Sequence, residues 1–488
     1  MIQPTIHYPK KAREVKDKDV LQEGDKEKMI EEPRTDFKVM EPKELLNYYD
    51  KHQHIKIVKA TCPFEKAIEL RDASFKDKFR EDDLYLKDPE AVARLRRGNS
   101  LIAYNFSPEV NGLIISRRGL CKFFDLRQEH IRVMKGETNQ EDLIKFGATA
   151  AFEYKTVVAE VASKLKAGCT ITVYRSGKAN GENAQISLVN IPTLGQMWVV
   201  CSKNVSLAFR NLKEIELYTE QRFSYAKMIA IRWFAIFNGL KPEAQAKVKQ
   251  VLETNTLVGE YCGHELCQHL VVYDKEDIIF YAIVPKSCQE VCWSMKTTFE
   301  FLDEVGLSKV KIEVVKDLKT LKDLGTVVEK MNEDLAKSTV QEEGEGSVVY
   351  FEAFNPTTNE WKILSMCKLK TLEYRFLRKI REKIKAVLRG NLTIEKALSK
   401  FDKECIELCS EYSPEVQKSL PKIEPYQELL QYGASICQSN SIPFEIVEKC
   451  FIDVLTLARK CQASLHHFNS DWGLRASQRH FNEEQTSI

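Results

Sequence analysis

The segment Thr170–Asn190 carries the residues best placed for covalent chemistry, because an alternating strand there leads through a short polar turn into a second strand. The turn reads Lys178-Ala-Asn-Gly181, so a lysine stands at the mouth of a strand and a glycine permits a tight turn. A lysine becomes a nucleophile when burial and neighbouring cations lower its pKa. The same four residues also fit an ordinary Asn-Gly hairpin, so on their own they leave both interpretations open.

Further charged and aromatic residues occupy strand positions downstream of this turn. Glu260 lies at a strand end, Phe280 lies in an aromatic-bearing strand, and Glu345 opens another strand. Lys368 and Lys370 are two residues apart in a strand, so their side chains share one face. Taken singly, each has an ordinary alternative: the acids as solvated strand ends, the phenylalanine as core, and the lysines as surface charge.

Upstream of the turn lie Arg96–Gly98 and the run Arg117–Asp125, which ends Lys-Phe-Phe-Asp. The complete series resembles the motifs of the covalent nucleotidyltransferases, the superfamily of polynucleotide ligases and mRNA capping enzymes. Within it, the chain is most similar to the RNA ligase 1 group, which includes phage RNA ligase and the adenylyltransferase domain of fungal and plant tRNA ligases. The resemblance covers about residues 90–375. Two departures are Asp125, where the family has asparagine, and a loose match between Gly181 and Glu260.

The resemblance implies an ATP-dependent RNA ligase that joins RNA 5′-phosphate and 3′-hydroxyl ends through lysyl-AMP and RNA-adenylate intermediates. Its expected cofactors are ATP and Mg²⁺ or Mn²⁺. The resemblance implies that Lys178 is the nucleophile and that Lys368 and Lys370 are catalytic cations on the α-phosphate. Arg97 and Lys122 would contact the outer phosphates or the leaving pyrophosphate, and Asn180 and Gly181 would be ATP-binding turn residues. Phe280 would stack on adenine, and Glu260 and Glu345 would be metal and ribose contacts.

Two other functions remain open on the sequence. A GTP-dependent capping-type nucleotidyltransferase would share the motifs, and so would a catalytically silent RNA-binding protein with this fold. The helical character after the last motif favours an RNA ligase, because DNA ligases and capping enzymes of the superfamily place a β-barrel there. No phosphate-cradling loop of a kinase is present in the sequence, so separate end-healing enzymes are expected partners, in RNA repair or tRNA splicing.

The segment Arg375–Arg389 predicts a basic amphipathic helix. Its cations Arg375, Arg378, Lys379 and Arg381 are candidates for binding RNA phosphates. The alternative is a solvated helix face paired with acidic residues elsewhere, since charge runs are commonly solvent-facing.

The hydrophobic patterns predict an α+β fold built on antiparallel sheets, followed by an all-α C-terminal domain. The resemblance implies that the antiparallel-sheet core is a nucleotidyltransferase core of the ATP-grasp-like type. Short β-rich runs such as Ala184–Asn190, His269–Tyr273 and Ser347–Phe354 alternate irregularly with helical stretches. The predicted organisation is a charged, flexible N-terminal arm over 1–50, an adenylyltransferase domain over 51–374, a helical and RNA-binding domain over 375–470, and a polar tail over 471–488.

The composition excludes a general polyanion binder, because 73 Lys+Arg against 71 Asp+Glu leave a formal charge of only +2 over 488 residues. With no signal sequence and no apolar run of membrane-spanning length, we expect a monomer of the cytoplasm or nucleus whose 14 cysteines stay reduced.

One cluster of possible metal ligands consists of Cys262, His264, Cys267 and His269. Its spacings fit either a zinc site or ordinary strand and loop residues, and the second interpretation is favoured.

Overall fold

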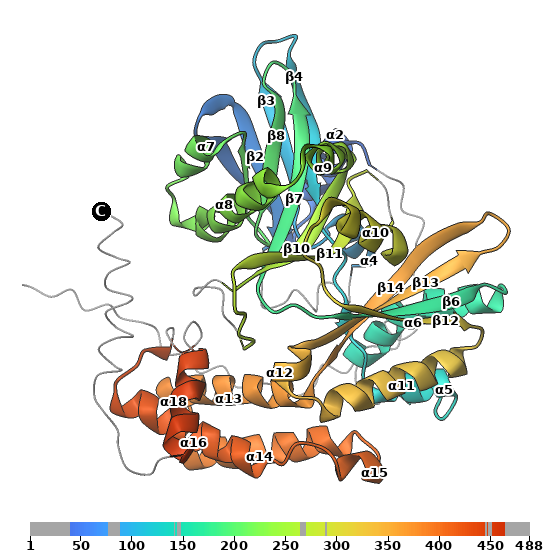
Figure 1. The fold of residues 1–488 in the computed structure, drawn as a ribbon, viewed down its shortest axis with the longest axis vertical. Helices are drawn as coiled ribbons and strands as arrows, with labels where there is room; N and C mark the ends of the chain where they lie inside the picture. Colours follow the sequence, from blue (N-terminus) through green and yellow to red (C-terminus); the bar gives the residue numbers. More distant parts are fainter. Residues whose placement is uncertain are drawn as a thin grey trace, which may run out of the picture.

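The computed structural model describes residues 40–76, 88–140, 142–143, 148–263, 270–287, 290–444, 447 and 451–463. Within them the chain forms three sheets with helices packed around them (Figure 1). The expected mixture of helices with antiparallel sheets is confirmed, since every strand pairing but one is antiparallel. None of the helices described is long and apolar enough to cross a membrane.

The first sheet has the order β1-β2-β3-β4, and the second has the order β11-β10-β7-β8-β9. The strands of the first are β1 (Ile55–Cys62), β2 (Glu65–Phe75), β3 (Asn99–Asn105) and β4 (Asn111–Arg118). The strands of the second are β7 (Glu182–Ile191), β8 (Gly195–Cys201), β9 (Ser206–Phe209), β10 (Asn255–Cys262) and β11 (Asp277–Pro285). Apolar side chains of both sheets share one core, which includes Ile68, Ile186 and Trp233.

The third sheet has the order β12-β6-β13-β14-β5. Its strands are β5 (Phe124–Asp125), β6 (Thr170–Gly177), β12 (Ile312–Leu318), β13 (Gly346–Asn355) and β14 (Glu360–Lys370). The two-residue strand β5 pairs with β14 in parallel, which is the single exception to the antiparallel rule. Because β6 leads directly into the Lys178 turn and then β7, that turn connects the third sheet to the second.

Helices cover these sheets on the faces that carry their apolar side chains. Next to the first two sheets lie α2 (Pro42–Lys51), α4 (Pro89–Arg94), α7 (Leu212–Glu216), the 3₁₀ turn η3 (Gln221–Phe223), α8 (Ser224–Gly239) and α9 (Pro242–Thr254). Next to the third lie α5 (Gln128–Lys135), α6 (Ala148–Lys166), α11 (Leu321–Lys337) and α12 (Val340–Glu343). Helix α10 (Met295–Val305) packs mainly against β11 of the second sheet and also touches the third. Helix α2 begins inside the segment predicted as a flexible arm, and its Tyr49 is only 1% exposed.

After β14 the regular structure that is described is helical. The helices are α13 (Leu372–Leu388), α14 (Ile394–Ser410), α15 (Pro414–Gln417), α16 (Glu424–Ser439) and α18 (Phe451–Ala463). They lie at one end of the molecule in Figure 1 and share a core of their own, which includes Phe376, Phe401 and Phe451. The Thr371 side chain caps α13 by accepting from the Tyr374 amide, so the cap of this helix directly follows Lys370 and the helix begins at Leu372. The division into separate domains stays a prediction.

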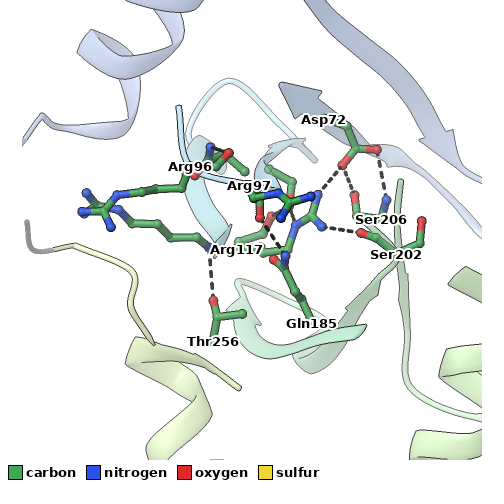
Figure 2. Close-up of polar contacts among 12 residues, drawn as sticks. Asp72, Arg96, Arg97, Arg117, Gln185, Ser202, Ser206 and Thr256 are labelled. Atoms are coloured by element: carbon green, nitrogen blue, oxygen red, sulfur yellow. Dashed lines mark hydrogen bonds and ion pairs between the residues drawn. The ribbon is translucent and has the colours of Figure 1, made fainter. Parts of the chain in front are cut away.

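A buried ionic cluster joins the first two sheets (Figure 2). The Arg117 guanidinium of β4 lies 3.4 Å from the Asp72 carboxylate of β2 and donates to the Ser202 carbonyl at 2.8 Å. Asp72 also accepts from the Ser206 hydroxyl and amide at 2.6 and 3.0 Å. Beside this cluster the side-chain amide of Gln185 donates to the Arg97 backbone carbonyl at 2.8 Å, so a residue of β7 positions the backbone of the Arg-Gly motif.

The cluster predicts a large stability cost for losing either buried charge. Arg117 is fully buried, so Arg117→Ala removes the buried cation of the Asp72 carboxylate and leaves only the more exposed Arg222, 3.7 Å away; we expect a loss of about 3–5 kcal/mol in the free energy of unfolding. The control is Arg132→Ala, since Arg132 is exposed and its ion pair with Glu137 is long at 3.9 Å. Urea unfolding followed by circular dichroism measures both, and equal midpoints for the two variants would contradict the expectation.

His130 in α5 predicts a pH dependence of stability. Its ring is fully buried, and burial lowers the pKa of His130 from 6.5 to about 4. Between these values the unfolded chain binds a proton that the folded chain does not, so the folded state loses stability as the pH falls from about 6.5 towards 4. Relative to His130→Gln, wild type is expected to lose about 2 kcal/mol more between pH 7.5 and pH 5. Urea titrations of both proteins at pH 7.5 and pH 5 measure this loss. An equal loss of unfolding free energy in wild type and His130→Gln would refute the expectation.

Candidate active site

Lys178 and Glu345 meet because the strands that carry them are neighbours. Lys178 follows the last residue of β6 and Glu345 precedes the first residue of β13, and these strands pair with Gly177 opposite Ser347. The Lys178 ammonium donates to the Glu345 carboxylate at 2.5 Å, and the Lys178 amide donates to the Gly346 carbonyl at 2.8 Å. The Glu345 side chain is 8% exposed and the Lys178 side chain 19%, so the ion pair stands at the edge of solvent.

Asn180 holds the turn in place through three hydrogen bonds. Its side-chain amide donates to the same Glu345 oxygen at 3.0 Å, and its side-chain oxygen accepts from the Leu270 amide at 3.1 Å. Its backbone amide donates to the Tyr273 hydroxyl at 2.8 Å. Gly181 is required next to it, because a Cβ atom at this position would lie 2.2 Å from the Tyr261 carbonyl oxygen.

The strand predicted over His269–Tyr273 is wrong for the part described, since residues 270–273 adopt no regular structure. The β-branched Val271 and Val272 favoured a strand locally, but the backbone of this segment bonds to Asn180 instead of a neighbouring strand. His269 itself lies outside the described residues.

The two acidic residues of the site have opposite pKa shifts. Burial alone would raise the pKa of Glu345, but the Lys178 ammonium outweighs it and holds that pKa below its usual range. Burial raises the pKa of Glu260 to about 8, although Lys178 and Arg97 act in the other direction and Glu345 adds repulsion. Among the described residues no cation makes an ion pair with Glu260, so this carboxylate fits a position for a divalent ion.

Lys368 and Lys370 lie at the end of β14 and share one face of the strand, as their spacing predicts. Both approach the Asp125 carboxylate, Lys368 at 3.5 Å and Lys370 at 3.7 Å. The parallel pairing of β5 with β14 explains the contact, because it places Asp125 directly opposite Lys368. Burial lowers the pKa of Lys370, with Asp125 acting against that shift.

The two upstream cations lie on the segments that enter the site. The Arg97 guanidinium is close enough to Glu260 to lower its pKa, so this motif arginine belongs to the same site. Lys122 is half-buried, and its ammonium lies over the Phe124 ring at 5.4 Å from the ring centroid. Their contacts with nucleotide phosphates stay predictions.

Phe280 is a correction to the site predicted from the sequence. Its side chain is fully buried and packs edge-on against Trp233, with ring centroids 6.0 Å apart, so it lies in the core and has no surface for adenine. The next residue, Tyr281, faces the site instead: its hydroxyl lies 3.5 Å from Glu260 and accepts from Asn183 at 3.2 Å. Both residues are aromatic, and a shift in the β10–β11 register at Gly259, opposite Phe280, decides which one faces the site.

Three of the four candidate cations of the basic helix α13 are paired with acidic residues. This pairing is what the alternative interpretation, a helix face paired with acidic residues elsewhere, predicts. Arg375 makes two hydrogen bonds to Glu411, at 3.0 and 3.1 Å, and Lys379 donates to Glu404 at 2.8 Å. Arg381 contacts Glu382 at 3.3 Å. Arg378 is exposed and has no ion pair among the described residues, so it is the cation of this group most open to a phosphate.

The possible zinc cluster is outside what the structure can place. Cys262 is buried at the end of β10, with its sulfur 3.6 Å from the Glu260 carbonyl. His264, Cys267 and His269 lie outside the described residues.

Sequence reasoning missed three tyrosines of the site. Tyr273 holds the Asn180 backbone, Tyr281 approaches Glu260, and a hydrogen bond between the hydroxyl of Tyr374 and Asn180 acts to lower the pKa of Tyr374, against the burial that raises it. The signal for Tyr374 was its position four residues after Lys370, in the first turn of the helix that follows. Tyr273 carried no such signal, because its neighbours read as an ordinary strand.

Comparison with known proteins identifies the family. A family model described as RNA ligase matches residues 107–374, which is more than half of the 488 residues, and the chain therefore belongs to the RNA ligase family. No curated protein sequence matches the chain.

Among solved structures, an archaeal ATP-dependent RNA ligase, form 1, is 10% identical, with 82% of this chain and 79% of that chain covered and a TM-score of 0.39. Naegleria gruberi RNA ligase with PPi is 10% identical, with 66% and 96% covered and a TM-score of 0.27. A mutant of the Naegleria gruberi enzyme with ATP and Mn is 11% identical, with 66% and 97% covered and a TM-score of 0.26.

Tyr273 is expected to act on the reaction by positioning the turn. Tyr273→Phe removes the acceptor of the Asn180 amide, a loss of about 1 kcal/mol for one hydrogen bond, so RNA-ligase kcat should fall about 5- to 10-fold with little change in the melting temperature. The control is Tyr432→Phe, because the Tyr432 hydroxyl has no hydrogen-bond partner among the described residues. Steady-state ligation by both variants tests this, and an unchanged kcat for Tyr273→Phe would remove the positioning role.

Proposed function

We propose that the protein is an ATP-dependent RNA ligase that joins 5′-phosphate and 3′-hydroxyl RNA ends through a lysyl-AMP intermediate. The observation that carries the proposal is the Lys178–Glu345 ion pair at 2.5 Å. A buried carboxylate orients the amine at the solvent edge and can accept the proton that the amine must lose before it attacks phosphorus, and further cations near it can stabilise the charge on the transferring phosphate. Family membership supports the same reaction class.

In the first step, the Lys178 nitrogen attacks the α-phosphorus of ATP. The ammonium first gives one proton to water or to the Glu345 carboxylate that it contacts. A phosphorus–nitrogen bond then forms, the bond from the α-phosphorus to its bridging oxygen breaks, pyrophosphate leaves with that oxygen, and the nitrogen gives a second proton to water. Lys368 and Lys370 would stabilise the negative charge on the transferring phosphate, because burial makes a fixed cation more effective. Arg97 and Lys122 would bind the outer phosphates.

The acidic residues fit a divalent metal ion. Glu260 and Glu345 supply two carboxylates whose charges interact with Lys178, and the burial that raises the pKa of Glu260 would be offset by a bound cation. Mg²⁺ or Mn²⁺ bound there would orient and screen the triphosphate. Asn180 holds Glu345, so it would fix one ligand of that ion.

In the later steps, AMP would pass to an RNA 5′-phosphate and a 3′-hydroxyl would displace it. The region 51–374 would then be the adenylyltransferase domain, with an antiparallel core of the ATP-grasp-like type, and 375–470 would be the helical RNA-binding domain. Arg378 is the first candidate there, because Arg375, Lys379 and Arg381 already have acidic partners. Such an enzyme needs RNA ends prepared by separate healing enzymes, in the cytoplasm or nucleus.

The proposal predicts covalent labelling of one lysine. Incubation with α-labelled ATP and Mg²⁺ should label the wild-type protein, and Lys178→Ala should abolish the label, because the nucleophile is gone. Lys311→Ala is the matched control: Lys311 is an exposed lysine beside the turn whose carbonyl, retained in the variant, accepts from Gly177. It should label as well as wild type.

The nucleotide that is retained separates the proposal from its alternatives. A label from α-labelled GTP and not ATP would show a capping-type enzyme, and RNA binding without any label would show a catalytically silent protein. A label that survives Lys178→Ala would contradict the assigned nucleophile.

A further inference from the structure

We propose that Asp125 is an internal anion that competes with the nucleotide phosphates for Lys368 and Lys370, and so sets how tightly the protein binds ATP. The inference rests on the proposed function, since it takes these two lysines as phosphate ligands. It assigns to Asp125 a role in setting ATP affinity that its place in the Lys-Phe-Phe-Asp run does not reveal.

The first support is the contact itself. Each oxygen of the Asp125 carboxylate faces a different lysine, Oδ2 towards Lys368 at 3.5 Å and Oδ1 towards Lys370 at 3.7 Å. A phosphate group would present its oxygens to two ammonium groups in the same way, because carboxylate and phosphate accept the same charge-assisted hydrogen bonds. The carboxylate therefore occupies the position that the proposed function gives to the α-phosphate.

The second support is the relative exposure of the three groups. The Asp125 side chain is 42% exposed, against 21% for Lys368 and 14% for Lys370. The carboxylate is thus the part of this cluster most open to solvent, and the ammonium groups lie deeper. An anion that enters from solvent must share the lysines with Asp125 or displace it.

The third support is that the backbone of Asp125 is held by strand pairing, so that the carboxylate can move only by rotation of the side chain. Strand β5 pairs in parallel with β14, and the Leu126 amide donates to the Lys368 carbonyl at 3.2 Å. Asp125 therefore stays beside the lysines whatever is bound, and only rotation of its side chain moves the carboxylate away. A permanent charge at this place affects every ligand of the lysine pair.

The surrounding charges keep Asp125 ionised. Burial acts to raise its pKa, but Lys370, Lys368, Arg375 and Arg127 outweigh burial and lower it, so the group is a carboxylate at neutral pH. Arg375 is already engaged by Glu411, and Arg127 lies 3.0 Å from Glu153. The acids nearly balance the cations here, which weakens the field that a phosphate would meet.

The family pattern shows what a neutral residue at this place would be. Asparagine, the residue of that pattern, has the same size as aspartate but no charge, so it would leave both lysines available to a phosphate. Asp125→Asn therefore isolates the charge from the shape of the side chain. A role in folding or positioning predicts weaker ATP binding after this change, whereas competition predicts tighter binding.

The test is equilibrium binding of α-labelled ATP with Mg²⁺ to protein that cannot react. In Lys178→Ala, addition of Asp125→Asn should lower the ATP dissociation constant about 3- to 10-fold, the range for two partly exposed ion pairs. Asp303→Asn is the matched control, because it removes an exposed aspartate paired with Lys309, away from the site, and should leave the constant unchanged. Asp125→Ser, also neutral, gives a second variant should the asparagine fold poorly.

Each other outcome overturns a stated part of the account. An unchanged or larger ATP dissociation constant for both neutral variants overturns the competition. A higher Mg²⁺ concentration needed for ATP binding by these variants also overturns it, because Asp125 would then be a metal ligand. Suppose that the Asp125→Asn change tightens ATP binding but the wild-type protein forms no lysyl-AMP. That result leaves this inference standing and contradicts only the proposed function. A protein that binds no ATP at all overturns both.

Discussion

The site depends on the antiparallel register of β6 with β13, which places Lys178 against Glu345. A largely buried carboxylate is costly unless a cation and hydrogen bonds compensate for its lost hydration. Here Lys178 and Asn180 both donate to one Glu345 oxygen, and the pairing strands fix the backbones on both sides. A one-residue slip of this register would turn the lysine and the glutamate to opposite faces of the sheet.

The same ion pair is tied to the C-terminal helices through short segments. The Leu270 side chain packs in the helical core, while its amide donates to the Asn180 side chain. On the other side, the Thr371 amide donates to the Glu345 carbonyl at 3.2 Å and its side chain caps α13. The position of the helices and the position of the lysine turn are therefore linked by hydrogen bonds, so a change in how these helices pack would reach the site directly.

Much of the site was predictable because its residues lie at strand ends, where alternation and order along the chain carry information. The order of these strand-end residues resembles the motif series of the covalent nucleotidyltransferases, and that resemblance placed Lys178, Asn180, Glu345, Lys368 and Lys370 in one site. The structure brings Lys178, Asn180 and Glu345 together at one turn, with Lys368 and Lys370 on the strand paired to β13. Face assignment failed for Phe280, because Tyr281 beside it is equally aromatic and the irregularity at Gly259 sets the phase. Tyr273 was missed because it acts from a segment without regular structure, which no periodicity signals. The charge of Asp125 was visible in the sequence, but its partners depend on the pairing of a two-residue strand.

The central claim is that this protein seals RNA through AMP held on Lys178. The most direct test is a single-turnover experiment with protein labelled by α-labelled ATP and then freed of nucleotide. With RNA carrying 5′-phosphate and 3′-hydroxyl ends, and without further ATP, the account predicts that the label leaves the protein as the RNA ends are joined. A label that stays on the protein, or sealing that proceeds equally well with Lys178→Ala, would contradict it.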